Sequence, residues 1–137
     1  MARILVVEDN PANMKLALLL LRNVGHEVLA AIDAESGLAL ARSERPDLIL
    51  MDVQLPGMDG LAATALLKQD PATASIPVVA VTAMAMASDR EKTRAAGCDG
   101  YISKPLRYRE LYACIDTLLG IPAPASPFDP PSTGPRA

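Results

Sequence analysis

Short apolar runs alternate with helical segments along most of the chain. The runs are rich in Val, Ile and Leu, and they lie at residues 4–7, 28–31, 48–51, 78–81 and 101–102. A run without polar alternation is typical of a strand buried on both faces, as in a parallel sheet covered by helices. Strand and helix repeated five times predict an α/β fold, a doubly wound five-stranded parallel sheet with helices on both faces.

Capping residues mark where the helices between these runs begin and end. Asn10 followed by Pro11 predicts an N-cap and a first helical position. Gly25 and Gly97 stand where two helices are expected to end. Further candidate N-caps are Asp33, Asp59 and Ser88.

The segment 121–137 differs in composition from the rest of the chain. It holds six of the twelve prolines, a density that no helix or inner strand tolerates. We therefore expect a folded domain at residues 1–120 and a flexible, partly extended Pro-rich tail at 121–137. Such a tail is either a docking peptide or a disordered terminus.

Size and charge narrow the classes of function. A length of 137 residues suits one domain. The net charge of −3 and the absence of a basic stripe argue against a nucleic-acid partner. Cys98 and Cys114 have no metal-ligand spacing and are expected to be reduced thiols. The apolar start is too short for a signal peptide and the run at 16–21 too short to insert into a membrane, so we expect a cytoplasmic protein.

Reactive side chains follow four of the expected strands. Glu8 and Asp9 come directly after the first, Asp52 ends the third, Thr82 follows the fourth and Lys104 follows the fifth. Because crossovers in such sheets are right-handed, the carboxyl ends of parallel strands lie on one edge, where ligands bind. These five side chains are therefore expected to converge.

The residue types indicate phosphoryl-transfer chemistry. Three neighbouring carboxylates repel one another unless a cation is present or one is protonated. Carboxylate oxygens with open water positions suit Mg²⁺, which binds phosphate oxygens as well. A hydroxyl and an ammonium group can compensate charge on a phosphoryl group, and a carboxylate can accept it as an aspartyl phosphate. Each feature alone is weak evidence, but the combination at successive strand ends is strong.

Four motifs resemble those of the response-regulator receiver domain of two-component signalling. They are Glu8-Asp9-Asn10, Asp52 with the following Pro56-Gly57-Met58-Asp59-Gly60, Val81-Thr82-Ala83, and Tyr101-Ile102-Ser103-Lys104-Pro105. The resemblance covers about residues 2–120 and implies the flavodoxin/CheY-like strand order 2-1-3-4-5. It also implies a switch rather than an enzyme, which a histidine kinase or histidine phosphotransfer protein phosphorylates and which then binds a downstream protein partner.

The resemblance assigns a role to individual residues. Asp52 is the phosphoacceptor. Magnesium is held by Glu8, Asp9, Asp52 and the backbone carbonyl of Gln54. The phosphoryl-binding and switch residues are Thr82, Lys104, Tyr101 and Ala83, and the bond Lys104–Pro105 is a cis peptide. The partner surface includes Asn13, Leu16, Met84 and Leu106, although Leu16 could instead pack against the sheet and Met84 could fill the core.

A finer resemblance concerns the pathway. Residues 8–16, 47–52, 76–83 and 97–105 are similar to those of single-domain regulators of bacterial cell division and cell polarity. Similar motifs occur in the receivers of hybrid kinases, so a phosphorelay in another pathway is the alternative. We expect a monomer or a weak dimer.

Two other functional classes are weighed against the switch. A phosphatase of the haloacid dehalogenase class needs a second Asp two positions after its nucleophile, but position 54 is Gln. A nucleotide-binding module of flavodoxin type needs a first loop rich in Gly, Ser or Thr to cradle phosphate. The loop at residues 8–11 is acidic and repels phosphate unless a metal is bound.

Overall fold

The computed structural model describes residues 2–83 and 87–120, so Met84 and the Pro-rich segment 121–137 lie outside the described residues. Strands and helices alternate throughout: β1 (Arg3–Val7), α1 (Pro11–Asn23), β2 (Glu27–Ala31), α2 (Ala34–Glu44), β3 (Leu48–Asp52), α3 (Gly60–Gln69), β4 (Val78–Thr82), α4 (Ala87–Ala96), β5 (Gly100–Ser103) and α5 (Tyr108–Leu119). The strands form one parallel sheet in the order β2-β1-β3-β4-β5. The predicted doubly wound fold and its strand order are confirmed.

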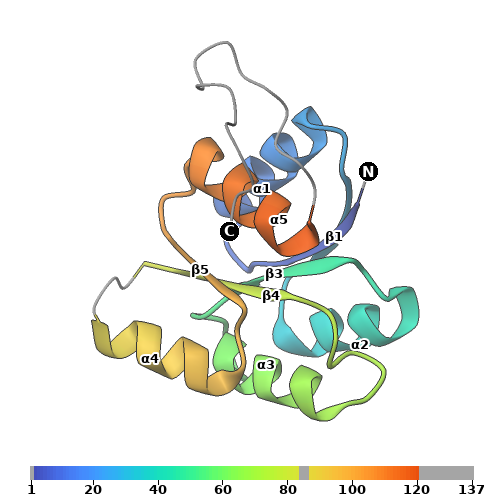
Figure 1. Cartoon of the computed structure of the whole chain (residues 1–137), viewed down its shortest axis with the longest axis vertical. Helices are drawn as coiled ribbons and strands as arrows, with labels where there is room; N and C mark the ends of the chain where they lie inside the picture. The colour runs from blue at the N-terminus through green and yellow to red at the C-terminus, as the bar shows by residue number, and fades with distance from the viewer. Residues whose placement is uncertain (1, 84–86, 121–137) are drawn as a thin grey trace, which may run out of the picture.

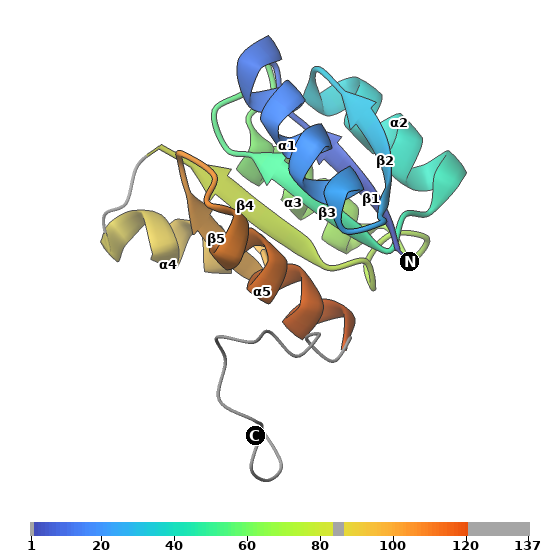
Figure 2. The same ribbon diagram turned by 90° about the horizontal axis from the view of Figure 1, so that it is seen from above.

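Helices cover both faces of the sheet. α1 and α5 lie on one face, and α2, α3 and α4 lie on the other (Figure 1 and Figure 2). Successive residues of β1 point to opposite faces: Ile4 and Val6 join the core under α1 and α5, whereas Leu5 and Val7 join the core under α2 and α3. The sheet therefore separates two aliphatic cores, as the near absence of aromatic residues requires.

Burial differs between the inner strands and the edge strands. β3 and β4 are buried at every position, and β1 is buried at all positions but Arg3. β2 and β5 are only partly buried. The prediction of burial on both faces is wrong for these two, because each lies at an edge of the sheet and has only one neighbouring strand.

Capping side chains begin three of the helices as predicted. The Asn10 side chain accepts hydrogen bonds from two backbone N–H groups in the first turn of α1, at 2.9 and 3.1 Å. Asp33 and Asp59 accept one such bond each at 2.8 Å, from α2 and α3. Ser88 is not an N-cap, because α4 begins at Ala87, a residue type with high helix propensity.

Glycine follows the ends of α1 and α4. Gly25 and Gly97 have φ of 87° and 103°, a left-handed conformation that residues with a Cβ rarely adopt. Both predicted helix ends are confirmed. Within the described ranges, no helix is long and apolar enough to cross a membrane.

A side-chain hydrogen bond joins the two helices on one face of the sheet. The Tyr112 hydroxyl of α5 donates to the Leu20 carbonyl of α1 at 2.7 Å. Leu20 lies in the last turn of α1, where carbonyl groups lack an intrahelical N–H donor. The tyrosine therefore satisfies a helix end and holds α1 against α5.

Replacing Tyr112 with Phe should lower the free energy of unfolding by about 1 kcal/mol, because the Leu20 carbonyl loses its donor. In urea unfolding, the midpoint should fall while the denaturant slope stays constant. Tyr108→Phe is the matched control, since this exposed hydroxyl contacts only the adjacent Arg109 among the hydrogen bonds described. Equal losses in the two variants would contradict the role of the Tyr112 hydroxyl.

Candidate functional site

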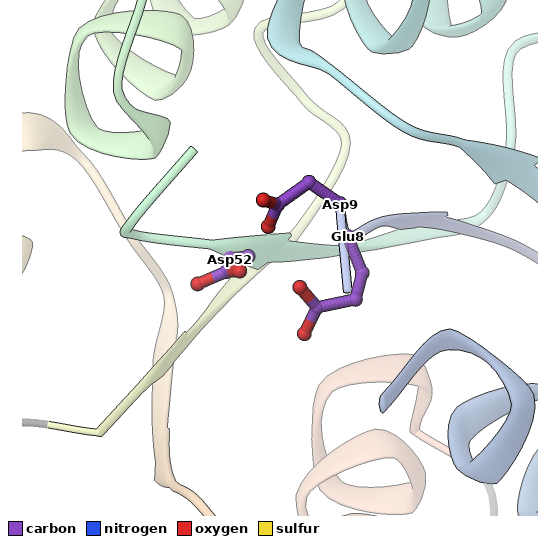
Figure 3. A group of neighbouring side chains, drawn as sticks. All are labelled: Glu8, Asp9 and Asp52. Carbon is purple, nitrogen blue, oxygen red and sulfur yellow. The ribbon is translucent and has the colours of Figure 1, made fainter. Parts of the chain in front are cut away.

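Five predicted site residues lie at the carboxyl edge of the sheet. Glu8 and Asp9 directly follow β1, and Asp52 is the last residue of β3. Thr82 is the last residue of β4, and Lys104 directly follows β5. All these strands run parallel, so residues far apart in the sequence meet at one edge. Figure 3 shows the three carboxylates grouped at the ends of β1 and β3.

The three carboxylates form a compact acidic cluster. One oxygen from each of Glu8, Asp9 and Asp52 lies within 4.8 Å of the other two. Glu8 is 5 % exposed and Asp52 2 % exposed, whereas Asp9 is open to solvent. Two of the three charges are thus removed from water, which is costly unless an opposite charge faces them.

Lys104 supplies that opposite charge. Its Nζ atom lies 2.9 Å from Glu8 Oε1 and 3.1 Å from Asp52 Oδ2. One ammonium group therefore bridges both buried carboxylates. The lysine side chain is itself largely buried, so solvent screens these contacts only weakly.

Burial and close contacts shift the pKa values of Glu8 and Lys104. The pKa of Glu8 is raised, chiefly because burial disfavours its charge and also because Asp52 lies beside it; the Lys104 ammonium opposes this. Burial alone would lower the pKa of Lys104, but its hydrogen bonds to Glu8 and Asp52 outweigh burial and raise it. Lys104 therefore stays charged at neutral pH.

Backbone groups orient the two buried carboxylates. The Gln54 N–H donates to Asp52 Oδ1 at 3.0 Å, and the Asn10 N–H donates to Glu8 Oε2 at 3.2 Å. In both residues one carboxylate oxygen faces a backbone donor and the other faces Lys104. The Asp52 side chain is thereby held in one orientation at the end of β3.

Gly60, the first residue of α3, belongs to one of the four motifs, but the sequence analysis assigned no role to it. Its N–H donates to the Val53 carbonyl at 3.0 Å, and a Cβ at this position would collide with the carbonyl oxygen of Asp52. Only glycine lets α3 start this close to the backbone of Asp52. A glycine directly after the capping Asp59 was the available signal, but only the fold shows which strand it approaches.

The remaining residues expected to bind or respond to the phosphoryl group lie on β4 and β5 or directly after them. Thr82 is buried and its carbonyl accepts the Lys104 N–H at 2.7 Å, while Ala83 is exposed. The bond Lys104–Pro105 is cis. Tyr101 on β5 is half-buried, and the Arg90 guanidinium of α4 lies 5.4 Å from the centre of its ring.

Of the four residues expected on the partner surface, two border the site. Asn13 and Leu106 line a small pocket together with Glu8 and Asp52, so both border the site directly. Leu16 is half-buried on α1 and is not part of the pocket wall. Met84 lies outside the described residues.

The donor set fits a hard divalent cation. Carboxylate oxygens are preferred ligands of Mg²⁺, and the exposed Asp9 leaves room for the waters that this ion retains. A bound magnesium ion would add to the positive charge that the Lys104 ammonium supplies to the same carboxylates. The site combines a buried carboxylate with a cationic neighbour, which are requirements for accepting a phosphoryl group.

Comparison with models of protein families identifies the family of this fold. The model of the response regulator receiver domain matches residues 4–116. The chain belongs to this family. Receiver domains act as phosphoacceptor switches of two-component systems and bind Mg²⁺ in their acidic pocket.

Individual receivers are similar over nearly their whole length. The polar-differentiation response regulator DivK of Brucella anthropi is 46 % identical over 117 residues, which cover 85 % of this chain and 95 % of that protein. The receiver domain of a sensor histidine kinase from Pseudomonas aeruginosa, solved with a magnesium ion in its active-site cleft, is 35 % identical with a TM-score of 0.81, covering 87 % of this chain and 98 % of its own. Chemotaxis protein CheY4 of Vibrio cholerae is 25 % identical with a TM-score of 0.82, and the match covers 86 % of this chain and 98 % of that chain.

Replacing Lys104 with Met should leave the buried carboxylates of this receiver without a counter-ion. Removing one partner of a buried ion pair costs about 3 kcal/mol, so the free energy of unfolding without divalent cations should fall by about that amount at neutral pH. The loss should shrink in acid. Without Lys104 the folded-state pKa of Glu8 rises further above its unfolded-state pKa. The folded variant then binds a proton more tightly than the unfolded chain, so its stability falls as pH rises from the unfolded-state pKa to the folded-state pKa.

Urea unfolding at neutral and acid pH measures both effects. Lys15→Met is the matched control, because Lys15 is an exposed residue of α1, and it should change stability by less than about 0.5 kcal/mol. A loss for Lys104→Met that is the same at both pH values would contradict the bridging role.

Proposed function

We propose that this chain is a single-domain phosphorylation switch in which Asp52 accepts a phosphoryl group from a histidine kinase or a histidine phosphotransfer protein. The observation that carries this proposal is the setting of the Asp52 carboxylate. It is buried at a strand end, held by the Gln54 N–H and Lys104, and grouped with the carboxylates of Glu8 and Asp9. Residues 1–120 form the switch, and the protein acts in the cytoplasm.

Phosphoryl transfer needs little covalent chemistry from the protein. An oxygen of Asp52 bonds to phosphorus while the bond from phosphorus to the donor histidine nitrogen breaks; the nitrogen keeps the electron pair and takes up a proton. The transition state is loose, so positioning and charge compensation dominate. The backbone bond from Gln54 supports this, because it fixes the nucleophile before the donor arrives.

Four groups of this chain would hold magnesium. They are the carboxylates of Glu8, Asp9 and Asp52 and the backbone carbonyl of Gln54. When bound, the ion supplies positive charge for the phosphoryl oxygens. The acidic cluster supports this assignment, as does the magnesium ion in the active-site cleft of the Pseudomonas receiver.

Lys104 couples phosphorylation to a change in shape. Without a phosphoryl group its ammonium bridges Glu8 and Asp52. A phosphoryl group on Asp52 offers the ammonium a stronger partner, and Thr82 offers a second contact through its hydroxyl. A ligand shifts an equilibrium only by its different affinity for the two states, and the loss of the contact with Glu8 is such a difference. Ala83 and Tyr101 carry the change to the surface that binds the downstream partner.

Control of cell division or cell polarity is the pathway we propose. The similarity to DivK, named for polar differentiation, supports this. A receiver in another phosphorelay, of the hybrid-kinase type, is the alternative, because the receiver of a sensor histidine kinase is similar too. Binding of purified histidine kinases to the wild type and to Asp52→Asn distinguishes these pathways by which kinase is retained.

Asp52→Asn should not be phosphorylated, since it lacks the nucleophile. Asp9→Ala should lose phosphorylation as well, because too few hard oxygen ligands remain for magnesium. The melting temperature of Asp9→Ala should be unchanged or higher, since repulsion within the acidic cluster is relieved. Intact-mass measurement after incubation with acetyl phosphate and Mg²⁺ counts the phosphoryl groups directly.

Glu35→Ala is the control for the loss of a carboxylate. Glu35 is exposed on α2, outside the acidic cluster, and this variant should gain one phosphoryl group as the wild type does. Phosphorylation of Asp9→Ala at the wild-type rate would refute the magnesium assignment. Rapid turnover of acetyl phosphate without a stable product would favour a phosphatase instead.

A protein donor must approach Asp52 past Asn13 and Leu106, which border its pocket. Asn13→Trp and Leu106→Trp should therefore lower kcat/KM for transfer from a histidine kinase that phosphorylates the wild type, by about tenfold, or ~1.4 kcal/mol. Phosphorylation by acetyl phosphate should be unaffected, because so small a donor needs no docking surface. Unchanged transfer from the kinase would show that docking occurs elsewhere.

A further inference from the structure

An apolar seam runs along α1 and α5, which lie on the same face of the sheet (Figure 2). We define the α1–α5 seam by Leu16, Leu20, Leu106, Tyr108 and Tyr112. Leu20, Leu106 and Tyr112 are partly buried against one core, and Tyr108 is 51 % exposed. The two tyrosine rings meet edge to face with their centres 6.0 Å apart. Leu16 lies one turn before Leu20 and shares its side of α1.

The α1–α5 seam reaches the phosphoacceptor at one end, because Leu106 lines the pocket that contains Asp52. The seam residues of α5 lie in the first half of the helix, which continues past Tyr112 and ends at Gly120. Gly120 has φ of 68°, and its N–H donates to the carbonyls of Asp116 and Thr117. This left-handed cap ends the helix and turns the chain away from the helix axis.

The chain beyond Gly120 has a composition that suits such a seam. Residues 121–137 lie outside the described residues and outside the range 4–116 that matches the family. They hold six prolines and Phe128, the one phenylalanine of the chain, which is followed by Asp129. Proline-rich segments dock into grooves lined by aromatic side chains, because their extended form loses little entropy on binding.

We propose that residues 121–137 bind the α1–α5 seam of the same chain, with Phe128 against Tyr108 and Asp129 facing the first turn of α5. The lengths agree. Tyr108 precedes Gly120 by about 18 Å of helix, at about 1.5 Å per residue. Phe128 follows Gly120 by about 25 Å of extended chain, at about 3.1 Å per residue. The extended segment is longer than the helix, and the extra length allows the chain to reverse its direction at Gly120.

Charge favours the same register. Arg107 and Arg109 lie at the start of α5. Arg107 forms an exposed ion pair with Glu110 at 3.9 Å, and the Arg109 guanidinium lies 5.7 Å from the centre of the Tyr108 ring. The positive end of the helix dipole lies there too, which adds to the attraction for a carboxylate. Asp129 directly follows Phe128, so a phenylalanine at Tyr108 brings its acidic neighbour to these arginines.

Phe128→Trp in the full chain tests the binding directly, since the protein has no other tryptophan. Its fluorescence should be blue-shifted and less quenched by acrylamide than that of the free peptide 121–137 with the same substitution. Adding Tyr108→Ala should return both signals to those of the peptide. Leu66→Ala, which alters an exposed leucine of α3 on the opposite face, should leave them unchanged.

Dilution separates binding within one chain from binding between copies, and phosphorylation tests the switch independently. Intramolecular binding predicts signals that do not depend on protein concentration. Emission like that of the free peptide in Phe128→Trp, insensitivity to Tyr108→Ala, or loss of the blue shift on dilution would each overturn the proposal. Acetyl phosphate labelling of the same variant reports on Asp52 independently, so failure of the seam and failure of the switch are distinguishable.

Discussion

The bridge from Lys104 to Glu8 and Asp52 is the interaction on which the site depends. Two carboxylates that are almost fully buried would repel each other and lose their hydration if they stood alone. One ammonium group at 2.9 and 3.1 Å makes their burial tolerable. The same arrangement makes the site responsive to a new negative charge, because such a charge competes with Glu8 and Asp52 for the Lys104 ammonium.

The topology of the sheet makes the bridge possible. Glu8, Asp52 and Lys104 come from three strands, and only parallel strands present their carboxyl ends on one edge. Gly60 lets α3 begin close against the end of β3, and the Gln54 N–H then holds the Asp52 carboxylate. The start of α3 and the donor that orients the reactive side chain therefore both lie at the end of β3.

Much of the fold could be predicted from local patterns, and the errors have local causes. Apolar runs located the strands, and Asn10, Asp33 and Asp59 located three helix starts. Burial at β2 and β5 was overestimated, because a run of apolar residues does not reveal whether a strand has one neighbour or two. The role of Gly60 was not predicted, because its constraint is a contact with a strand residue eight positions earlier, which no helix signal encodes.

The class of fold, the approximate positions of the strands and, through four motifs, the receiver family could be read from the sequence alone. The fold class and the strand positions follow from periodicity and capping, which act between near neighbours, whereas the family follows from the resemblance of the motifs. Contacts between elements appear only in the tertiary structure. Lys104 bridges Glu8 and Asp52, Asp9 is the one exposed carboxylate of the acidic cluster, and Tyr112 joins α5 to α1. Distances between side chains on different elements depend on how the whole sheet twists and packs, so no local pattern contains them.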